Sequence, residues 1–174
     1  MQPIEKKPEA WQRGPIPEIP GLLQPVAHAL VQATEEVEEM VRDFPDDLLW
    51  EKPAGMASVG FHLMHLSGVA DRLFTYARGE QLSDGQREFL KKETIPNQPG
   101  ITAKILAKQF NQQVNKCLDQ LRQTNESTLT EFRGIGRKQI PTNVLGLLFH
   151  TAEHTMRHTG QLLVTVGVLK NQSR

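Results

Sequence analysis

Apolar residues recur at intervals of three and four along four segments of this 174-residue chain, the spacing of one face of an α-helix. These segments run from about residue 19 to 44, 59 to 78, 102 to 123 and 142 to 169. Ser58 and Thr142 suit the N-terminal caps of the second and fourth helices, and Gly79 suits the end of the second. The pattern predicts an all-α protein, an up-and-down four-helix bundle, with sites built from side chains on facing helices.

The segments outside these helices predict irregular structure. Five prolines among the first 20 residues exclude a regular helix there. We expect residues 1–18 to form an extended, proline-rich arm with Trp11 as its anchor, and residues 19–170 to form the bundle domain. Residues 80–100 predict a loop with a short helical turn, and alternating residues with two glycines at 128–142 predict a short hairpin or an irregular turn.

Composition narrows the classes of partner and compartment. Twenty basic residues balance twenty acidic ones, which argues against nucleic acid or an anionic membrane surface as a partner. The single cysteine, Cys117, excludes an internal disulfide and falls on an apolar helix face, as an inert core thiol would. No stretch reaches the roughly 18 to 20 apolar residues of a membrane span. These features predict a soluble, cytoplasmic protein.

The last helical segment carries three of the six histidines, His150, His154 and His158, at intervals of four. On a helix of about 100° per residue, His158 lies within the apolar arc, His154 at its border and His150 on the polar flank. His154 and His158 therefore face the bundle interior, where two imidazoles can converge on one ion. His150 and His158, about 12 Å apart, cannot easily do so. A structural histidine pair is the alternative.

A second histidine cluster lies in the stretch SVGFHLMHLSG, where His62 and His65 both reach the inner side of the second helix. If this helix faces the last one, one of the two could complete a set of three imidazoles. Three neutral imidazoles and a water form an open site of the kind found in catalytic zinc enzymes. Periodicity alone does not choose between His62 and His65.

The order of these motifs resembles the DinB/YfiT-like superfamily of four-helix metal-binding proteins. The matching elements are Trp50 and Pro53 in the connector, Ser58 to Gly60, His65, and finally His154, His158, Gly160 and Gln161. The resemblance implies that the metal ligands are His65, His154 and His158. Thr159 stands where the family usually has arginine, and the roles of His62 and His150 stay open.

The resemblance also implies a function. One divalent metal ion, zinc or nickel, would sit at the three-histidine site, and a low-molecular-weight thiol would be the cosubstrate of a metal-dependent transferase. The alternatives are a metal-dependent hydrolase of small substrates and a non-enzymatic metal-binding stress-response scaffold. Family members are commonly homodimers, which agrees with a second apolar face on the last helix. That face comprises Leu145, Phe149, Ala152, Met156 and Leu163.

Three further residues are candidates for catalysis. Arg72 and Tyr76 share the phase of His65 on the second helix, where they could bind an anionic group or donate a proton. Glu153 completes an H-x-x-E-H motif, the inverted zinc-protease signature. Such a protease would need a carboxylate ligand downstream, and none of the residues after His154 is acidic. Glu153 is better interpreted as a surface residue or as a partner that orients an imidazole.

Overall fold

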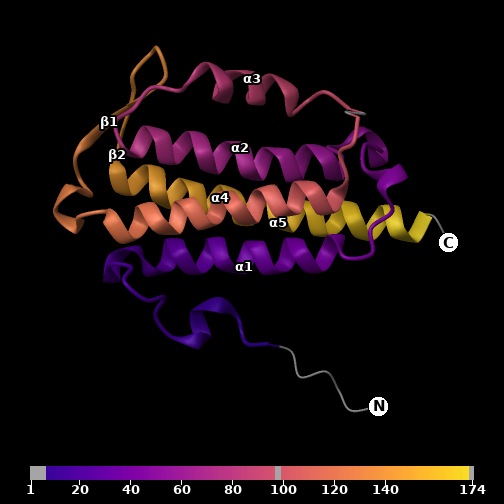
Figure 1. Cartoon of the computed structure of the whole chain (residues 1–174), viewed down its shortest axis with the longest axis horizontal. Coiled ribbons are helices and arrows are strands. Elements are labelled where there is room, and N and C mark those ends of the chain that lie inside the picture. Colours follow the sequence, from indigo (N-terminus) through magenta and orange to yellow (C-terminus); the bar gives the residue numbers. More distant parts are fainter. Residues whose placement is uncertain (1–6, 97–98, 173–174) are drawn as a thin grey trace.

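In a computed structural model of the protein, which describes residues 7–96 and 99–172, four long helices form a bundle (Figure 1). The long helices are α1 (Gln24–Val41), α2 (Val59–Ala77), α4 (Ala103–Gln123) and α5 (Val144–Gln172). The shorter elements are η1 (Ala10–Arg13), η2 (Gly21–Leu23), η3 (Asp46–Leu48), η4 (Pro53–Gly55), α3 (Asp84–Lys92), η5 (Glu126–Thr128), β1 (Phe132–Ile135) and β2 (Ile140–Asn143). The all-α four-helix bundle expected from the sequence is confirmed.

Local hydrogen bonds explain where the helices begin. The Ser58 hydroxyl accepts a hydrogen bond from the backbone N–H of Phe61 at 3.2 Å, so Ser58 caps α2 as expected. The first turn of α5 is capped instead by Asn143, whose Oδ1 accepts from the N–H of Gly146 at 2.7 Å. Thr142 is not the cap, because β2 continues through Asn143 and pairs with β1 in an antiparallel hairpin.

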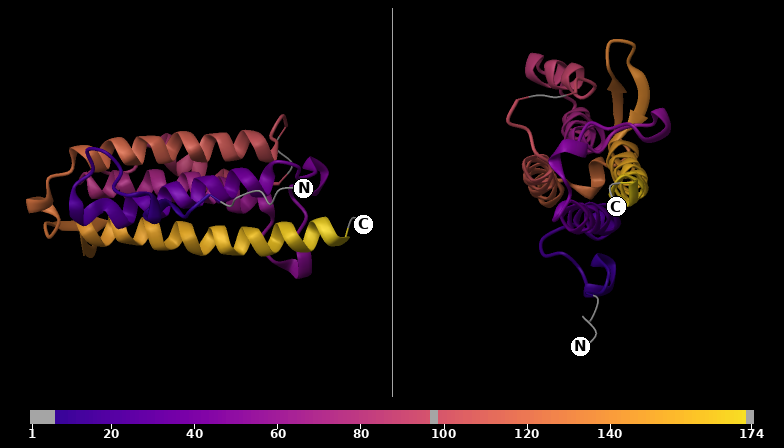
Figure 2. Two further views of the ribbon diagram at one scale, coloured as in Figure 1. Left: turned by 90° about the horizontal axis from the view of Figure 1, so that it is seen from below. Right: turned by 90° about the vertical axis from the view of Figure 1, so that its right-hand side faces the viewer.

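The four long helices form a ring in which α1 and α2 each lie against α4 and α5 (Figure 2). The sequence predicted an up-and-down order of the four helices, but the connection from α2 to α4 is long and carries α3 back along the bundle (Figure 1). As a result α4 runs in the same direction as α2, and Gln120 near its end donates to the carbonyl of Phe74 near the end of α2, at 3.0 Å. α2 and α5 run in opposite directions and pack side by side, which brings their histidines together.

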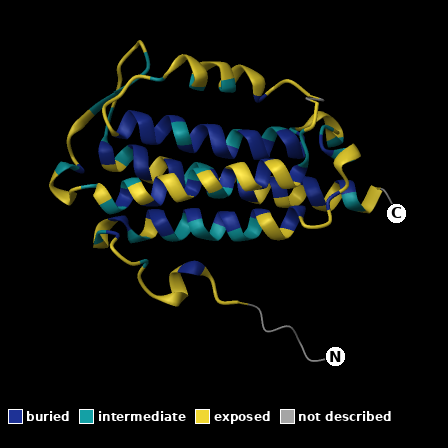
Figure 3. Ribbon diagram, in the orientation of Figure 1, coloured by how far each residue is buried: buried dark blue, intermediate teal, exposed yellow. Residues whose placement is uncertain are grey.

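The core fills the space between the four helices (Figure 3). Its largest fully buried side chains are Phe74, Phe110, Leu23, Leu30, Leu49, Leu63, Leu66, Leu106, Leu121, Leu147, Leu148 and Leu162. Cys117 is buried among them on α4, and burial raises the pKa of its thiol to about 12. A thiol held in its neutral form is unreactive, so Cys117 is a core residue.

The connector before α2 fixes where that helix starts. A Cβ atom at Gly60 would lie 2.6 Å from the ring of Trp50, so only glycine lets the indole pack flat against the first turn. The Gly60 N–H also donates to the carbonyl of Leu49 at 2.8 Å. Trp50 and Gly60 therefore fix the start of α2 together. The start of the helix in turn fixes the position of His62 and His65 along the bundle.

Residues 1–6 of the predicted N-terminal arm lie outside the described residues; from residue 7 on the arm lies against α1, but Trp11 is not its anchor. Trp11 is 63% exposed, and its indole N–H donates to the surface carboxylate of Glu9. The small side chain of Ala10 is buried instead, and its N–H donates to Gln32 Oε1 at 2.8 Å. The arm runs so close to α1 at this point that the methyl group of Ala10 fits between them, whereas the indole of Trp11 would not. Among the described helices, none has the length and apolar character needed to cross a membrane.

Candidate metal centre

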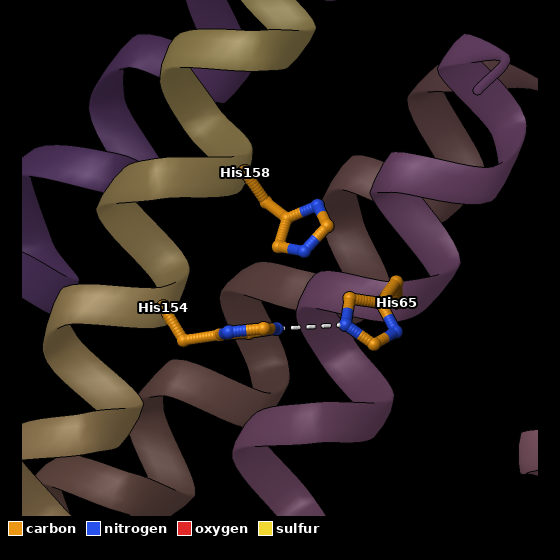
Figure 4. Close-up of side chains that lie close together, drawn as sticks. All are labelled: His65, His154 and His158. Atoms are coloured by element: carbon orange, nitrogen blue, oxygen red, sulfur yellow. Dashed lines mark hydrogen bonds between the residues drawn. The ribbon is translucent and has the colours of Figure 1, made fainter. Parts of the chain in front are cut away.

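The facing sides of α2 and α5 bring three histidines together (Figure 4). His65 comes from α2, and His154 and His158 come from successive turns of α5. Each offers one ring nitrogen, and these three nitrogens lie within 4.8 Å of one another. The Nε2 atoms of His65 and His154 are 2.9 Å apart. The structure thus brings together the three rings that the family resemblance singled out.

The outer nitrogens of two of these rings are held by neighbours. His65 Nδ1 lies 2.8 Å from Glu93 Oε2, and His158 Nδ1 lies 3.0 Å from Nδ1 of His62. Because an ionised carboxylate can only accept a hydrogen bond, His65 carries its proton on Nδ1 and presents a lone pair at Nε2. His62 is 3% exposed and contacts His158 rather than completing the cluster. It is thus placed as a partner of one of the three rings.

Burial keeps these imidazoles neutral. Desolvation, followed by the proximity of His65, lowers the pKa of His62 to about 4. The same causes, with His154 and His62 adding, lower the pKa of His158 to about 3, and desolvation also lowers the pKa of His154. A neutral imidazole keeps the lone pair that a metal ion needs. Near neutral pH His154 and His158 therefore both keep a lone pair that a metal ion can bind.

These lowered pKa values predict that the metal-free protein loses stability as the pH falls from about 7 to about 5. In the unfolded chain each histidine has a pKa of about 6.5, so unfolding takes up protons that the folded protein does not bind. The free energy of unfolding in urea, with a chelator present, should be lower at pH 5 than at pH 7. Carboxylates titrate mostly below this window, so histidines dominate the change.

The control for this pH dependence is a matched pair of asparagine substitutions. Replacing both His62 and His158 by asparagine should flatten the change between pH 7 and pH 5. His150→Asn should leave it unaltered, because His150 is exposed on the outer side of α5. A free energy of unfolding that is the same at both pH values in the parent protein would contradict the assignment.

The three rings fit a divalent metal ion by their chemistry. Imidazole nitrogens bind such ions at about 2.0 to 2.1 Å, which spaces neighbouring ligand atoms by about 3.3 Å in a tetrahedral site. The three facing nitrogens lie within 4.8 Å of one another, which is close to this spacing. His154 Nδ1 is a buried polar atom without a hydrogen-bond partner in the described part of the chain, so this ring is the one least constrained by its surroundings. The cluster could therefore hold one metal ion and leave a ligand position open.

Sequence reasoning missed two residues that contact the cluster. Glu93 follows the last residue of α3 and reaches His65, although nothing in the polar stretch KKETIP marks it as buried. Phe61 stacks on His65 with ring centroids 5.3 Å apart and planes at 11°. Its position four residues before His65 on one helix was a signal that could have identified it.

The catalytic candidates from the sequence lie elsewhere. The guanidinium of Arg72 is paired with Glu93 at 2.5 Å, so Arg72 reaches the cluster only through that carboxylate. Tyr76 lies three turns beyond His65, roughly 16 Å along α2, beside the hairpin glycine Gly136. Glu153 pairs with Arg157 and lies 3.4 Å from His150 on the outer side of α5. None of the three touches the facing ring nitrogens.

Solved structures of known proteins share this fold. A DinB-like protein from Bacillus cereus superposes with a TM-score of 0.61 at 19% identity, covering 83% of this chain and 91% of that one. A conserved protein from Enterococcus faecalis gives a TM-score of 0.65 at 18% identity, covering 82% and 94%. A search of curated proteins finds no significant match.

A third solved structure corrects one expectation. The colibactin self-resistance protein ClbS, crystallised in complex with double-stranded DNA, superposes with a TM-score of 0.54 at 14% identity, covering 79% of this chain and 90% of that one. The exclusion of nucleic acid as a partner, drawn from the balanced charge of the chain, was therefore wrong. Net charge does not report the local patches or grooves with which a protein of this fold binds DNA.

The family follows from the sequence itself. The family model described as the DinB superfamily matches residues 29–162, which include α2, α4 and all three clustered histidines. This match spans more than half of the chain and agrees with the superposed structures. The chain belongs to the DinB superfamily.

Proposed function

We propose that this protein binds one divalent metal ion through His65, His154 and His158, and acts as a metal-dependent transferase with a low-molecular-weight thiol as cosubstrate. The observation that carries the metal site is the convergence of three imidazole nitrogens within 4.8 Å of one another. Zinc or nickel are the ions we expect, because imidazole ligands suit both. The transferase activity is supported by the family resemblance alone.

The chain's own residues prepare such a site in two ways, by holding the outer ring nitrogens and by covering one ring. A bound ion would supply Lewis acidity and lower the pKa of a coordinated thiol or water. Glu93 and His62 hold the outer nitrogens of His65 and His158, which directs the inner nitrogens toward a common point. Phe61 covers one face of His65 and keeps water from that side.

A neighbouring cavity supports a small substrate. It has a volume of about 230 Å³ and lies between the connector before α2 and the segment after α3. Phe61 and Glu93, which both contact His65, form part of its wall together with Trp50 and Met56. Apolar walls of this kind suit the carbon skeleton of a small electrophile.

The proposed reaction predicts turnover that needs both metal and thiol. Protein loaded with zinc or nickel is assayed against an electrophilic aromatic halide, with glutathione or cysteine as the thiol. The parent protein should exceed its His158→Ala variant by at least about 100-fold, because a catalytic metal ion contributes several kcal/mol of transition-state stabilisation in general. Product formation is followed by absorbance, with the uncatalysed thiol reaction subtracted.

Other outcomes select the alternatives. Hydrolysis of activated esters by the metal-loaded protein without added thiol would favour the hydrolase. Stoichiometric metal with no turnover on either substrate class would favour the non-enzymatic scaffold. In that case the metal should raise the free energy of unfolding and have no effect on turnover. Duplex DNA is included as a further ligand in the binding assays, because ClbS was crystallised with it.

Two expectations from the sequence stay predictions. The cytoplasmic location is one of them. The homodimer is the other, and the structure divides the apolar face on which it rested: Ala152 is buried inside the bundle, whereas Leu145, Phe149 and Leu163 are exposed.

A further inference from the structure

Glu93 is the one carboxylate that is fully withdrawn from solvent among the described residues. It is 2% exposed, although α3, which it follows, contributes no buried residue to the core. Burial of a carboxylate is costly unless charge and hydrogen bonds compensate for it. An acidic residue buried at the end of an otherwise exposed helix therefore calls for an explanation in terms of its partners.

Arg72 contacts both oxygens of Glu93, and His65, also on α2, contacts one of them. Oε1 accepts from Arg72 Nη1 at 2.5 Å, and Oε2 lies 2.8 Å from His65 Nδ1. Arg72 is itself buried, so the ion pair is shielded from water on both sides. The chain thus forms a continuous connection, Arg72 to Glu93 to His65, that ends at the three-histidine cluster.

A glycine on α2 leaves the space in which Glu93 contacts Arg72 and His65. His65, Gly68 and Arg72 follow one another at intervals of three and four and so share one side of the helix. A Cβ atom at Gly68 would overlap Glu93 Oε1 and would lie 2.6 Å from Arg72 Nη1. Glycine at this position leaves the space that the carboxylate occupies between the other two side chains.

We propose that Glu93 is a positioning residue for His65, and that Arg72 holds Glu93 in place for this role. The inference rests on the proposed metal site and deepens it. The carboxylate fixes the proton of His65 on Nδ1, aims Nε2 at His154 and His158, and increases the electron-donating power of the imidazole. Carboxylates that hold ligand histidines in this way change metal affinity by 10- to 100-fold in general.

The competing explanation is that the ion pair merely fastens α3 to α2. Two variants separate the explanations. Glu93→Gln keeps an oxygen that can accept from His65 Nδ1 but removes the charge. A double variant, Arg72→Met with Glu93→Leu, replaces the buried pair by apolar groups of similar size, an exchange that often preserves or raises stability. Glu35→Gln is the matched control, because Glu35 also binds an arginine through both oxygens, but on the N-terminal arm.

Zinc affinity is measured for each variant by competition with a chromophoric chelator. We expect a loss of about 10-fold for Glu93→Gln and of about 10- to 100-fold for the double variant, with no change for Glu35→Gln. Urea unfolding shows whether the variants remain folded. A double variant that is as stable as the parent and binds zinc equally well would overturn the proposal in favour of simple fastening.

A second readout does not depend on metal. In the metal-free protein, ¹⁵N-resolved NMR of the imidazoles reports which nitrogen of His65 carries the proton. The parent and Glu93→Gln should show Nδ1–H, and the double variant should show a mixture or the Nε2–H form. Nδ1–H persisting unchanged in the double variant would overturn the positioning role. If the parent bound no zinc, the proposed function would fail, and this readout would still decide whether Glu93 sets the proton of His65.

Discussion

Replacing any one of His65, His154 and His158 by alanine should reduce the metal bound to the purified protein from about one ion per chain to less than about a tenth of that. Each ring supplies one of three nitrogens that meet at a single point, and two remaining imidazoles hold a divalent ion far more weakly in general. Elemental analysis of the protein after gel filtration measures the content directly.

The control for this experiment is His150→Ala. His150 belongs to the same row of histidines on α5 but is exposed and pairs with Glu153, so its loss should leave the metal content unaltered. His62→Ala should retain the metal with a lower affinity, because His62 touches His158 and not the point of convergence. Full metal content in all three ligand variants, or its loss in His150→Ala, would show that the ion lies elsewhere.

Phe110→Ala should produce the largest loss of stability, about 3 to 5 kcal/mol. The side chain of Phe110 is completely buried where α4 faces the other helices, and truncation leaves a cavity that rigid neighbours cannot fill. Urea denaturation followed by circular dichroism measures the free energy of unfolding. Metal content should persist while the variant is folded, because α4 contributes no ligand.

Phe149→Ala is the same chemical change at a surface position. Phe149 is 62% exposed on α5, so its truncation should alter the free energy of unfolding by less than about 0.5 kcal/mol in the monomer. Equal destabilisation by the two substitutions would contradict the assignment of Phe110 to the core.

The long helices were predictable because their apolar residues repeat with the period of a helix over many turns. The ends of α2 and α4 were predicted to within about one residue, since Ser58 and Thr102 cap them through hydrogen bonds local to the sequence. The start of α5 was less accurate, because Asn143 is both the last residue of a strand and the cap of the helix. Two adjacent elements compete there, and propensity does not decide between them.

The candidate site was only partly accessible to sequence reasoning. Helical phase placed His154 and His158 on the inner side of α5, and a family resemblance was needed to choose His65 over His62. Glu93 could not have been found in this way, because its burial depends on how α3 folds back over α2. A contact that depends on the path of a long connection does not produce a periodic pattern in the sequence of that connection.

The distance along the chain between the clustered rings has a consequence for assembly. His65 and His154 are separated by 89 positions, and two of the three rings belong to α5, which follows the other three long helices in the sequence. A nascent chain that has emerged only as far as α4 possesses a single one of these nitrogens and cannot retain an ion. Binding of a metal ion would thus require that α5 has packed against α2. Partial detachment of α5 would release the ion before the other three helices unfold.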